Sequence, residues 1–159
     1  MKRRAKILWW LLGCAAAAFL AARYVASPFV VVGESMSPTL RSWDLCVLQR
    51  VYHYQPRRGD VILFRTADDP PVHFIKRVIA VPGETVAVSC GVVQLNGAPL
   101  PESYTTASSN WDLAPTNVPP GRVFVIGDNQ AEGGTETWRG FVATRLVMGR
   151  LIWHGRWKS

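Results

Sequence analysis

The sequence VHFIKRVIAVPGE, residues 72–84, is an apolar run with a strong preference for β-structure that ends in a turn. Its β-branched and aromatic residues favour a strand, and Pro82-Gly83 favours a turn. The same alternation of short apolar runs and turn residues recurs from residue 29 onward. It predicts strands at residues 29–32, 45–48, 61–64, 74–81, 85–88, 92–95, 123–126 and 147–153. Many short strands separated by turn signals are typical of an all-β sandwich or barrel, so we predict a mainly β fold.

Residues 86–121 differ in composition from the strands around them. Asn96-Gly97 is a strong signal for a tight hairpin turn. Residues 99–121 contain five prolines, are largely polar and show no clear strand pattern. We therefore predict that residues 86–121 form a small inserted subdomain of the β domain, in which residues 99–121 are a surface excursion.

The N-terminal segment contains no charged residue from Ile7 to Ala22. Extended to Ala26, it would form a helix about 30 Å long, which matches the hydrocarbon core of a bilayer. The basic residues before it favour a cytoplasmic N-terminus. We predict a cytoplasmic tail at 1–6, a single transmembrane helix at 7–26 and an exported catalytic domain at 29–159. Two alternatives stay open: a cleaved signal peptide, and a lipoprotein signal that ends at Cys14.

The net charge of +7 is concentrated at the two ends of the chain. Residues 1–30 and 139–159 each carry five basic and no acidic residues, whereas residues 31–138 carry eight basic and eleven acidic residues. This distribution argues against a nucleic-acid-binding face and agrees with a membrane protein. The three cysteines form no C-x-x-C motif, so we predict no metal site and no cofactor. Pairing of Cys46 with Cys90 stays open for an exported domain.

Two serines follow the first predicted strand, in the stretch Gly33-Glu34-Ser35-Met36-Ser37-Pro38. Ser37 precedes a proline, which is a common arrangement at the first turn of a helix, and is interpreted as a structural cap. Ser35 lies close to Gly33, where backbone can approach a substrate, and is the better candidate nucleophile. On spacing alone, an ordinary turn serine is the alternative for Ser35.

Lys76 interrupts the apolar run at residues 72–81. In a regular strand it shares a face with Phe74 and Val78, so apolar side chains would flank its amine. Burial disfavours the charged form of a lysine and lowers its pKa from the usual value of about 10.4, as a lysine general base requires. The alternative is a lysine that protects an edge strand from aggregation.

A third candidate is the turn Gly127-Asp128-Asn129, which follows the predicted strand at 123–126. These residue types are common in ordinary turns, which is one interpretation. The other is functional, because the carboxylate of Asp128 is suited to orient an arginine, either Arg77 or Arg139.

Taken together and in order, four blocks of sequence resemble the type I signal peptidase family, in its bacterial or organellar branch. They are SMSPTL at 35–40, RGDVILF at 58–64, IKRVIAVPGE at 75–84 and GDN at 127–129. Residues 94–97 also look like the hairpin of that family's inserted piece. The resemblance covers nearly the whole chain. It implies an antiparallel β-sheet protease domain with a small inserted β/loop subdomain, preceded by one N-terminal transmembrane helix.

The resemblance implies a Ser/Lys protease, in which Ser35 attacks the scissile carbonyl and neutral Lys76 takes its proton. The backbone N–H of Ser35 would be one donor to the oxyanion. The further residues implied at the oxyanion or the substrate are Gly33, Met36, Pro38 and Ile75. Those implied in a supporting role are Arg77, Asp128 and Asn129.

The resemblance also implies partners and a location. The substrates would be pre-proteins with small residues such as alanine before the cut, and the chain would sit in a lipid bilayer without binding nucleic acid. We predict the bacterial inner membrane, with the N-terminus in the cytoplasm and the catalytic domain outside. The mitochondrial inner membrane is the alternative.

Two departures from the family pattern stand out. Gly33 occupies a position where many members have a serine whose hydroxyl helps to bind the oxyanion. After the Gly-Asp-Asn turn, many members have a serine that helps to hold the lysine, and this chain has Gly133 there. Glu132, Thr135 and Glu136 are candidates to replace that serine. A catalytically silent relative that binds exported peptides or assists an active peptidase therefore stays open as an alternative. So does a specialised protease with one dedicated substrate, or a self-cleaving regulator of the same β fold.

Overall fold

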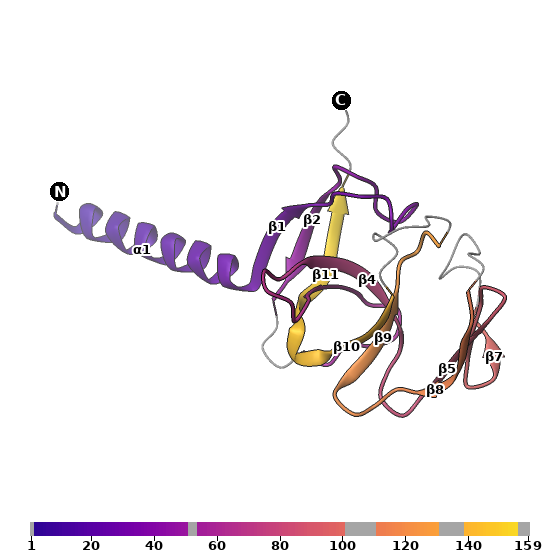
Figure 1. Ribbon diagram of the computed structural model, residues 1–159. Coiled ribbons are helices and arrows are strands. Elements are labelled where there is room, and N and C mark those ends of the chain that lie inside the picture. The colour runs from indigo at the N-terminus through magenta and orange to yellow at the C-terminus, as the bar shows by residue number, and fades with distance from the viewer. Residues whose placement is uncertain (1, 51–53, 101–110, 131–138, 156–159) are drawn as a thin grey trace.

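The computed structural model describes residues 2–50, 54–100, 111–130 and 139–155 (Figure 1). One helix, α1 (Lys2–Val25), projects from a body made of β-strands. The chain passes from Val25 directly into β1 (Ala26–Val30), so the helix ends one residue before the predicted boundary at residue 26. In the described part of the chain, no helix combines the length and the apolar character that a membrane crossing requires.

A seven-stranded sheet forms the larger part of the body, in the order β1-β2-β11-β3-β4-β9-β10. Besides β1, its strands are β2 (Leu45–Gln49), β3 (Val61–Arg65), β4 (His73–Ala80), β9 (Arg122–Ile126), β10 (Gly140–Ala143) and β11 (Val147–Gly155). A short 3-10 helix, η3 (Thr144–Leu146), joins the last two. All the neighbouring pairs are antiparallel, which confirms the predicted mainly antiparallel β fold.

A separate four-stranded sheet lies between β4 and β9 in the sequence, at the end of the body remote from α1 (Figure 1). Its order is β7-β6-β5-β8, with β5 (Thr85–Ser89), β6 (Val92–Leu95), β7 (Ala98–Pro99) and β8 (Leu113–Asn117). The turn between β6 and β7 contains Asn96 and Gly97, both with positive φ angles of 51° and 83°. An Asn-Gly pair suits this backbone because both residues tolerate the left-handed region.

All eight predicted strands overlap a strand of the structure, whereas β7, β8 and β10 were not predicted. The absence of a strand from residues 99–121 is therefore a wrong prediction, since β8 lies there. Its sequence, LAPTN, has little apolar pattern and contains Pro115. Such a strand is tolerated because β8 is an edge strand that pairs only with β5 among the described residues, and proline is confined to such edges. Residues 101–110 of the same segment lie outside the described residues.

β4 is packed on both faces, and this makes it a rigid platform. Val78 on one face belongs to a cluster with Ile62 and Val125. Ile79 belongs to a second cluster, which β4 and β9 share with the four-stranded sheet. A third cluster, centred on Met36 and Leu40, supports the turn between β1 and β2. Apolar burial of this kind is the main stabilising contribution to a fold, so both β4 and that turn are held firmly.

Cys46 and Cys90 are not bonded to each other. Cys46 is buried on β2, whereas Cys90 is exposed at the turn after β5, and both are free thiols. Burial, and to a smaller extent the charge of Asp44, raises the pKa of Cys46 to about 11. Cys46 therefore behaves as a small apolar core residue, and the alternative of a Cys46–Cys90 disulfide is not realised.

Candidate active site

Ser35 and Lys76 meet in the structure. The Nζ atom of Lys76 donates a hydrogen bond to Oγ of Ser35 over 2.6 Å. Lys76 is only 1% exposed, near the middle of β4, and its Nζ lies 5.9 Å from the ring centroid of Phe74. β4 lies between β3 and β9, so the interpretation of Lys76 as an edge-strand lysine is wrong. The fold therefore brings the hydroxyl of Ser35, a candidate nucleophile, into direct contact with the buried amine of Lys76.

The turn after β9 holds the backbone on which Ser35 lies. The N–H of Asn129 donates to the carbonyl of Ser35 (3.0 Å), and its side-chain Nδ2 donates to the carbonyl of Glu34 (3.2 Å). Gly127 packs against the same carbonyl so closely that a Cβ atom there would lie 2.3 Å from the oxygen of Ser35. Position 127 consequently accepts only glycine without a shift of the backbone.

Asp128 forms a buried, bidentate ion pair with Arg77. Nε of Arg77 donates to Oδ1 of Asp128 over 2.7 Å, and Nη2 donates to Oδ2 over 2.6 Å. The hydroxyl of Thr39 also donates to Oδ2 over 2.5 Å, and Nη1 of Arg77 donates to the carbonyl of Gly59 over 2.9 Å. Bidentate pairs fix geometry as well as charge. Arg77 thus joins β4, the turn after β9 and the turn that contains Ser35.

The two arginines proposed as partners of Asp128 have different surroundings. Arg77 takes that role, whereas the guanidinium of Arg139 lies 4.2 Å from the centroid of the Trp111 ring. This stacking is a cation–π contact. Burial lowers the pKa of Arg139.

The remaining predicted residues lie around the same turn. Gly33 has a φ angle of 103°, which favours glycine, and its N–H donates to Oγ of Ser42 over 3.2 Å. Met36 is 1% exposed and packs beneath the turn, while Ile75 is half-buried against the same cluster. Pro38 is exposed and follows a cis peptide bond.

The interpretation of Ser37 as a helix cap is wrong. Residues 33–40 form bends and turns, and no helix begins at Pro38. The N–H of Ser37 donates to the carbonyl of Glu34 over 3.0 Å, and the N–H of Leu40 donates to the carbonyl of Met36 over 2.9 Å. Ser37 is therefore structural in a different way, as part of a hydrogen-bonded turn.

Sequence reasoning missed several polar residues in this region, among them Thr39, Ser42 and Gln130. Thr39 is part of the SMSPTL block, and Gln130 follows GDN directly, so adjacency to a motif was the only available signal. Ser42 carried no signal, because only the fold brings it to Gly33. The candidates to replace the missing serine, Glu132, Thr135 and Glu136, together with Gly133, lie outside the described residues.

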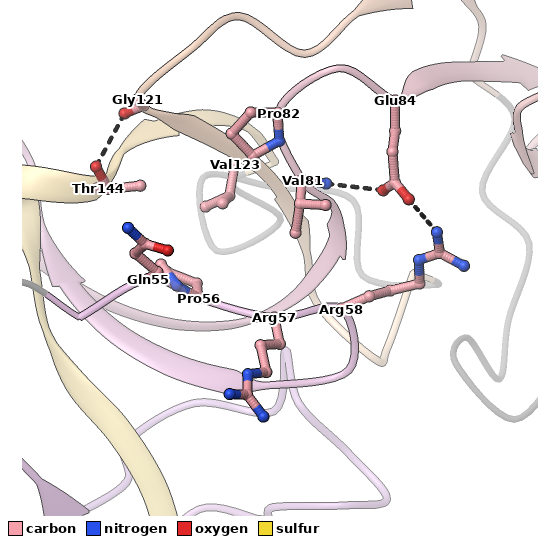
Figure 2. Close-up of a pocket in the computed structure, with 10 residues that line it drawn as sticks. All are labelled: Gln55, Pro56, Arg57, Arg58, Val81, Pro82, Glu84, Gly121, Val123 and Thr144. Atoms are coloured by element: carbon pink, nitrogen blue, oxygen red, sulfur yellow. Dashed lines mark hydrogen bonds and ion pairs between the residues drawn. The ribbon is translucent and has the colours of Figure 1, made fainter.

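A pocket of about 620 Å³ lies apart from these residues (Figure 2). It is lined by Gln55, Pro56, Arg57, Arg58, Val81, Pro82, Glu84, Gly121, Val123 and Thr144. On one side an ion pair joins Arg58 to Glu84, whose other oxygen accepts the N–H of Val81 over 2.9 Å. None of its lining residues belongs to the Ser35–Lys76 arrangement, so the pocket is a separate feature.

The family model that matches this chain is described as signal peptidase, peptidase S26, and it matches residues 4–154. A probable signal peptidase I-1 of Synechocystis is 37% identical over 138 residues, which are 81% of this chain and 70% of that protein. A signal peptidase I of Leptolyngbya laminosa is 36% identical and covers 81% of this chain and 68% of its own length. A crystal structure of a signal peptidase I from Enterococcus faecalis is 29% identical, with a TM-score of 0.47, and covers 62% of this chain and 98% of its own.

Proposed function

Because this chain belongs to the signal peptidase family, peptidase S26, we propose that it is a serine endopeptidase that removes N-terminal signal peptides from exported pre-proteins. The observation that carries the proposal is the 2.6 Å distance between Nζ of Lys76 and Oγ of Ser35, across which a proton can be transferred. Relatives that resemble the chain over most of its length are named signal peptidases. No observation supports the alternative of a catalytically silent relative.

In the proposed reaction, the neutral amine of Lys76 takes the proton of the Ser35 hydroxyl as Oγ attacks the scissile carbonyl. The resulting ammonium then gives that proton to the leaving amine, and an acyl-enzyme ester remains on Ser35. A water molecule, deprotonated by the same amine, attacks the ester. The water proton passes to Oγ as the ester bond breaks, and the signal peptide leaves with a new C-terminal carboxyl group; the mature protein has already left as the amine. Lys76 accepts and passes on two protons, the first from Ser35 to the leaving amine and the second from water to Oγ, so Lys76 ends neutral and Ser35 regains its hydroxyl.

The burial of Lys76 supports this role. A side chain that is 1% exposed has lost its hydration, and this disfavours the ammonium relative to the amine. The clamp from Asn129 to the carbonyls of Ser35 and Glu34 fixes the nucleophile before substrate arrives. Such fixed geometry lowers the entropic part of the reaction barrier.

In our proposal the substrate, including the oxyanion formed from its scissile carbonyl, contacts the turn at residues 33–40 that contains Ser35. The N–H of Ser35 donates to the developing oxyanion, and Gly33 lets the substrate backbone come close. Met36, Pro38 and Ile75 border the substrate, with Met36 acting through the turn that it supports from below. Arg77, Asp128 and Asn129 support the arrangement through their ion pair and through the bonds of Asn129 to the backbone of Glu34 and Ser35.

Cleavage of a pre-protein with alanines at the first and third positions before the cut tests the proposed function. The detergent-solubilised chain is expected to cut it at that single bond and to release a signal peptide. A pre-protein with lysine directly before the cut should stay intact, since a small residue is required there. The Ser35→Ala variant, purified in parallel, controls for contaminating peptidases. Absence of cleavage by the unaltered chain would contradict the proposal.

We propose further that α1 anchors the chain in a membrane, with the catalytic strands on the outer side and the N-terminus in the cytoplasm. Support comes from the uncharged run 7–22, in which several large apolar side chains are exposed, among them Trp9, Trp10 and Phe19. A helix of 24 residues is about 36 Å long, enough for a hydrocarbon core. The proposed units are a tail at 1–6, an anchor at 7–26 and a catalytic domain at 29–159 with its insertion at 86–121. The bacterial inner membrane is the proposed location.

Extraction of isolated membranes with alkaline carbonate tests the anchor. The full chain is expected to stay in the pellet, because a buried apolar helix is not released by high pH or salt. A chain lacking residues 2–25 should appear in the supernatant, or be retained only weakly. Release of the full chain by carbonate would contradict the anchor without affecting the proposed peptidase activity.

A further inference from the structure

Gln130 is a buried polar residue beside the Ser35–Lys76 pair, and the mechanism above does not use it. It follows the Gly127-Asp128-Asn129 turn directly and is only 1% exposed. Its side-chain Nε2 donates a hydrogen bond to the carbonyl of Gly127, three residues earlier. The side chain of Gln130 therefore forms a hydrogen bond back to the first residue of the turn.

Gly127 is a residue of this turn whose Cα faces both members of the pair. A Cβ atom placed on it would lie 2.3 Å from the carbonyl oxygen of Ser35 and 3.5 Å from Nζ of Lys76. A movement of Gly127 by a few tenths of an ångström would consequently change the space in which Ser35 and Lys76 meet. The carbonyl of Gly127 accepts the bond from Gln130, which restrains its position.

Stability alone does not account for a glutamine at this position. Its second polar atom, Oε1, is buried and has no hydrogen-bond partner among the described residues. A buried acceptor without a donor destabilises the folded state, and an apolar side chain of similar size would avoid that cost. What the glutamine provides instead is the hydrogen bond to the carbonyl of Gly127, which fixes the geometry of the turn.

We propose that Gln130 is a positioning residue, which sets the relative placement of Ser35 and Lys76 through the carbonyl of Gly127. This inference rests on the proposed function, because the pair it positions is the proposed catalytic pair. Gln130 itself does not touch the reacting atoms. Its loss should lower the rate of the chemical step more than the affinity for substrate, since the turn supports the nucleophile and the base.

The test compares the unaltered chain with Gln130→Met and Gln130→Glu. Methionine has a similar shape but cannot donate a bond, and glutamate keeps the acceptor oxygens but lacks the amide donor. Both variants should lower kcat for the pre-protein by about tenfold or more while KM changes by less than about twofold. Gln94→Met, on β6 of the other sheet, is the matched control and should leave kcat unchanged. Thermal unfolding by circular dichroism verifies that each variant is folded.

A second measurement reads the position of Lys76 without any cleavage. The chain has four lysines, Lys2, Lys6, Lys76 and Lys158, so the Cε resonance of Lys76 in ¹³C-lysine-labelled protein is identified by its absence from Lys76→Met. We expect that resonance to shift in Gln130→Met and Gln130→Glu and not in Gln94→Met. A shift in a chain that cleaves no pre-protein would sustain the inference and refute the proposed function. Unchanged kcat and an unchanged resonance in both folded Gln130 variants of an active chain would overturn the inference alone.

Discussion

Replacement of Lys76 by methionine is expected to lower kcat for pre-protein cleavage by about 10²- to 10⁴-fold, the usual contribution of a general base. KM should stay within about twofold, because Lys76 is buried behind Ser35 and contacts the nucleophile rather than the substrate. The variant should fold as well as the unaltered chain. Methionine fills a similar volume, and its apolar side chain suits a position beside Phe74 and Val78.

Steady-state cleavage assays give kcat and KM, and thermal unfolding gives the stability. The matched control is Arg65→Met, which removes an exposed cation from the neighbouring strand β3 and should leave both quantities unchanged. Full activity in Lys76→Met would mean that Lys76 is not the base. A loss of activity accompanied by unfolding would be explained by packing instead, and the thermal measurement separates the two results.

Replacement of Asp128 by alanine is expected to lower the free energy of unfolding by about 3–5 kcal/mol, as for other broken buried ion pairs. The side chain of Asp128 is 4% exposed and that of Arg77 is 15% exposed, so the guanidinium would lose this carboxylate in a largely buried position. Thr39 would also lose its acceptor. Cleavage activity should fall as well, because Arg77 and Asp128 join β4 to the turns on either side of the pair.

Urea unfolding of Asp128→Ala measures this loss, with Asp68→Ala, an exposed acidic residue, as the matched control. The double variant Arg77→Met/Asp128→Leu completes a cycle and should recover much of the stability, since it removes both buried charges together. An Asp128→Ala variant as stable as the unaltered chain would show that the ion pair contributes nothing to the free energy of unfolding. In that case its role would be confined to positioning.

The strands were predictable because their apolar runs are separated by residues with strong turn preferences. Asn96-Gly97 and Pro82-Gly83 are such turns, and both glycines have positive φ angles of 83° and 86°. The missed strands show the limit of this reasoning. β8 depends on pairing with β5 rather than on an apolar pattern, and β10 (Gly140–Ala143) is a short strand that pairs with β9. Tertiary pairing overrides local preference in both cases.

The contact of Ser35 with Lys76 was anticipated from a resemblance, and the residues alone left both roles ambiguous. What the strand pattern did provide was the face of Lys76, shared with Phe74. Ser42 and Gln130 were not foreseen, because serine and glutamine are ordinary residues in turns and neither bond follows from an apolar pattern or a turn signal. Ser37 was misassigned because a proline after a serine suits a turn as well as a helix start.

The bonds that assemble the candidate site span long stretches of sequence. Lys76 and Ser35 are 41 residues apart, and Asn129 and Glu34 are 95 residues apart. Contacts of such high sequence separation require the long loops between them to close first, which slows folding. During synthesis from the N-terminus, Ser35 therefore lacks the bonds from Asn129 to its backbone until β9 has paired with β4. Cleaving activity is therefore expected to appear only after the body has folded.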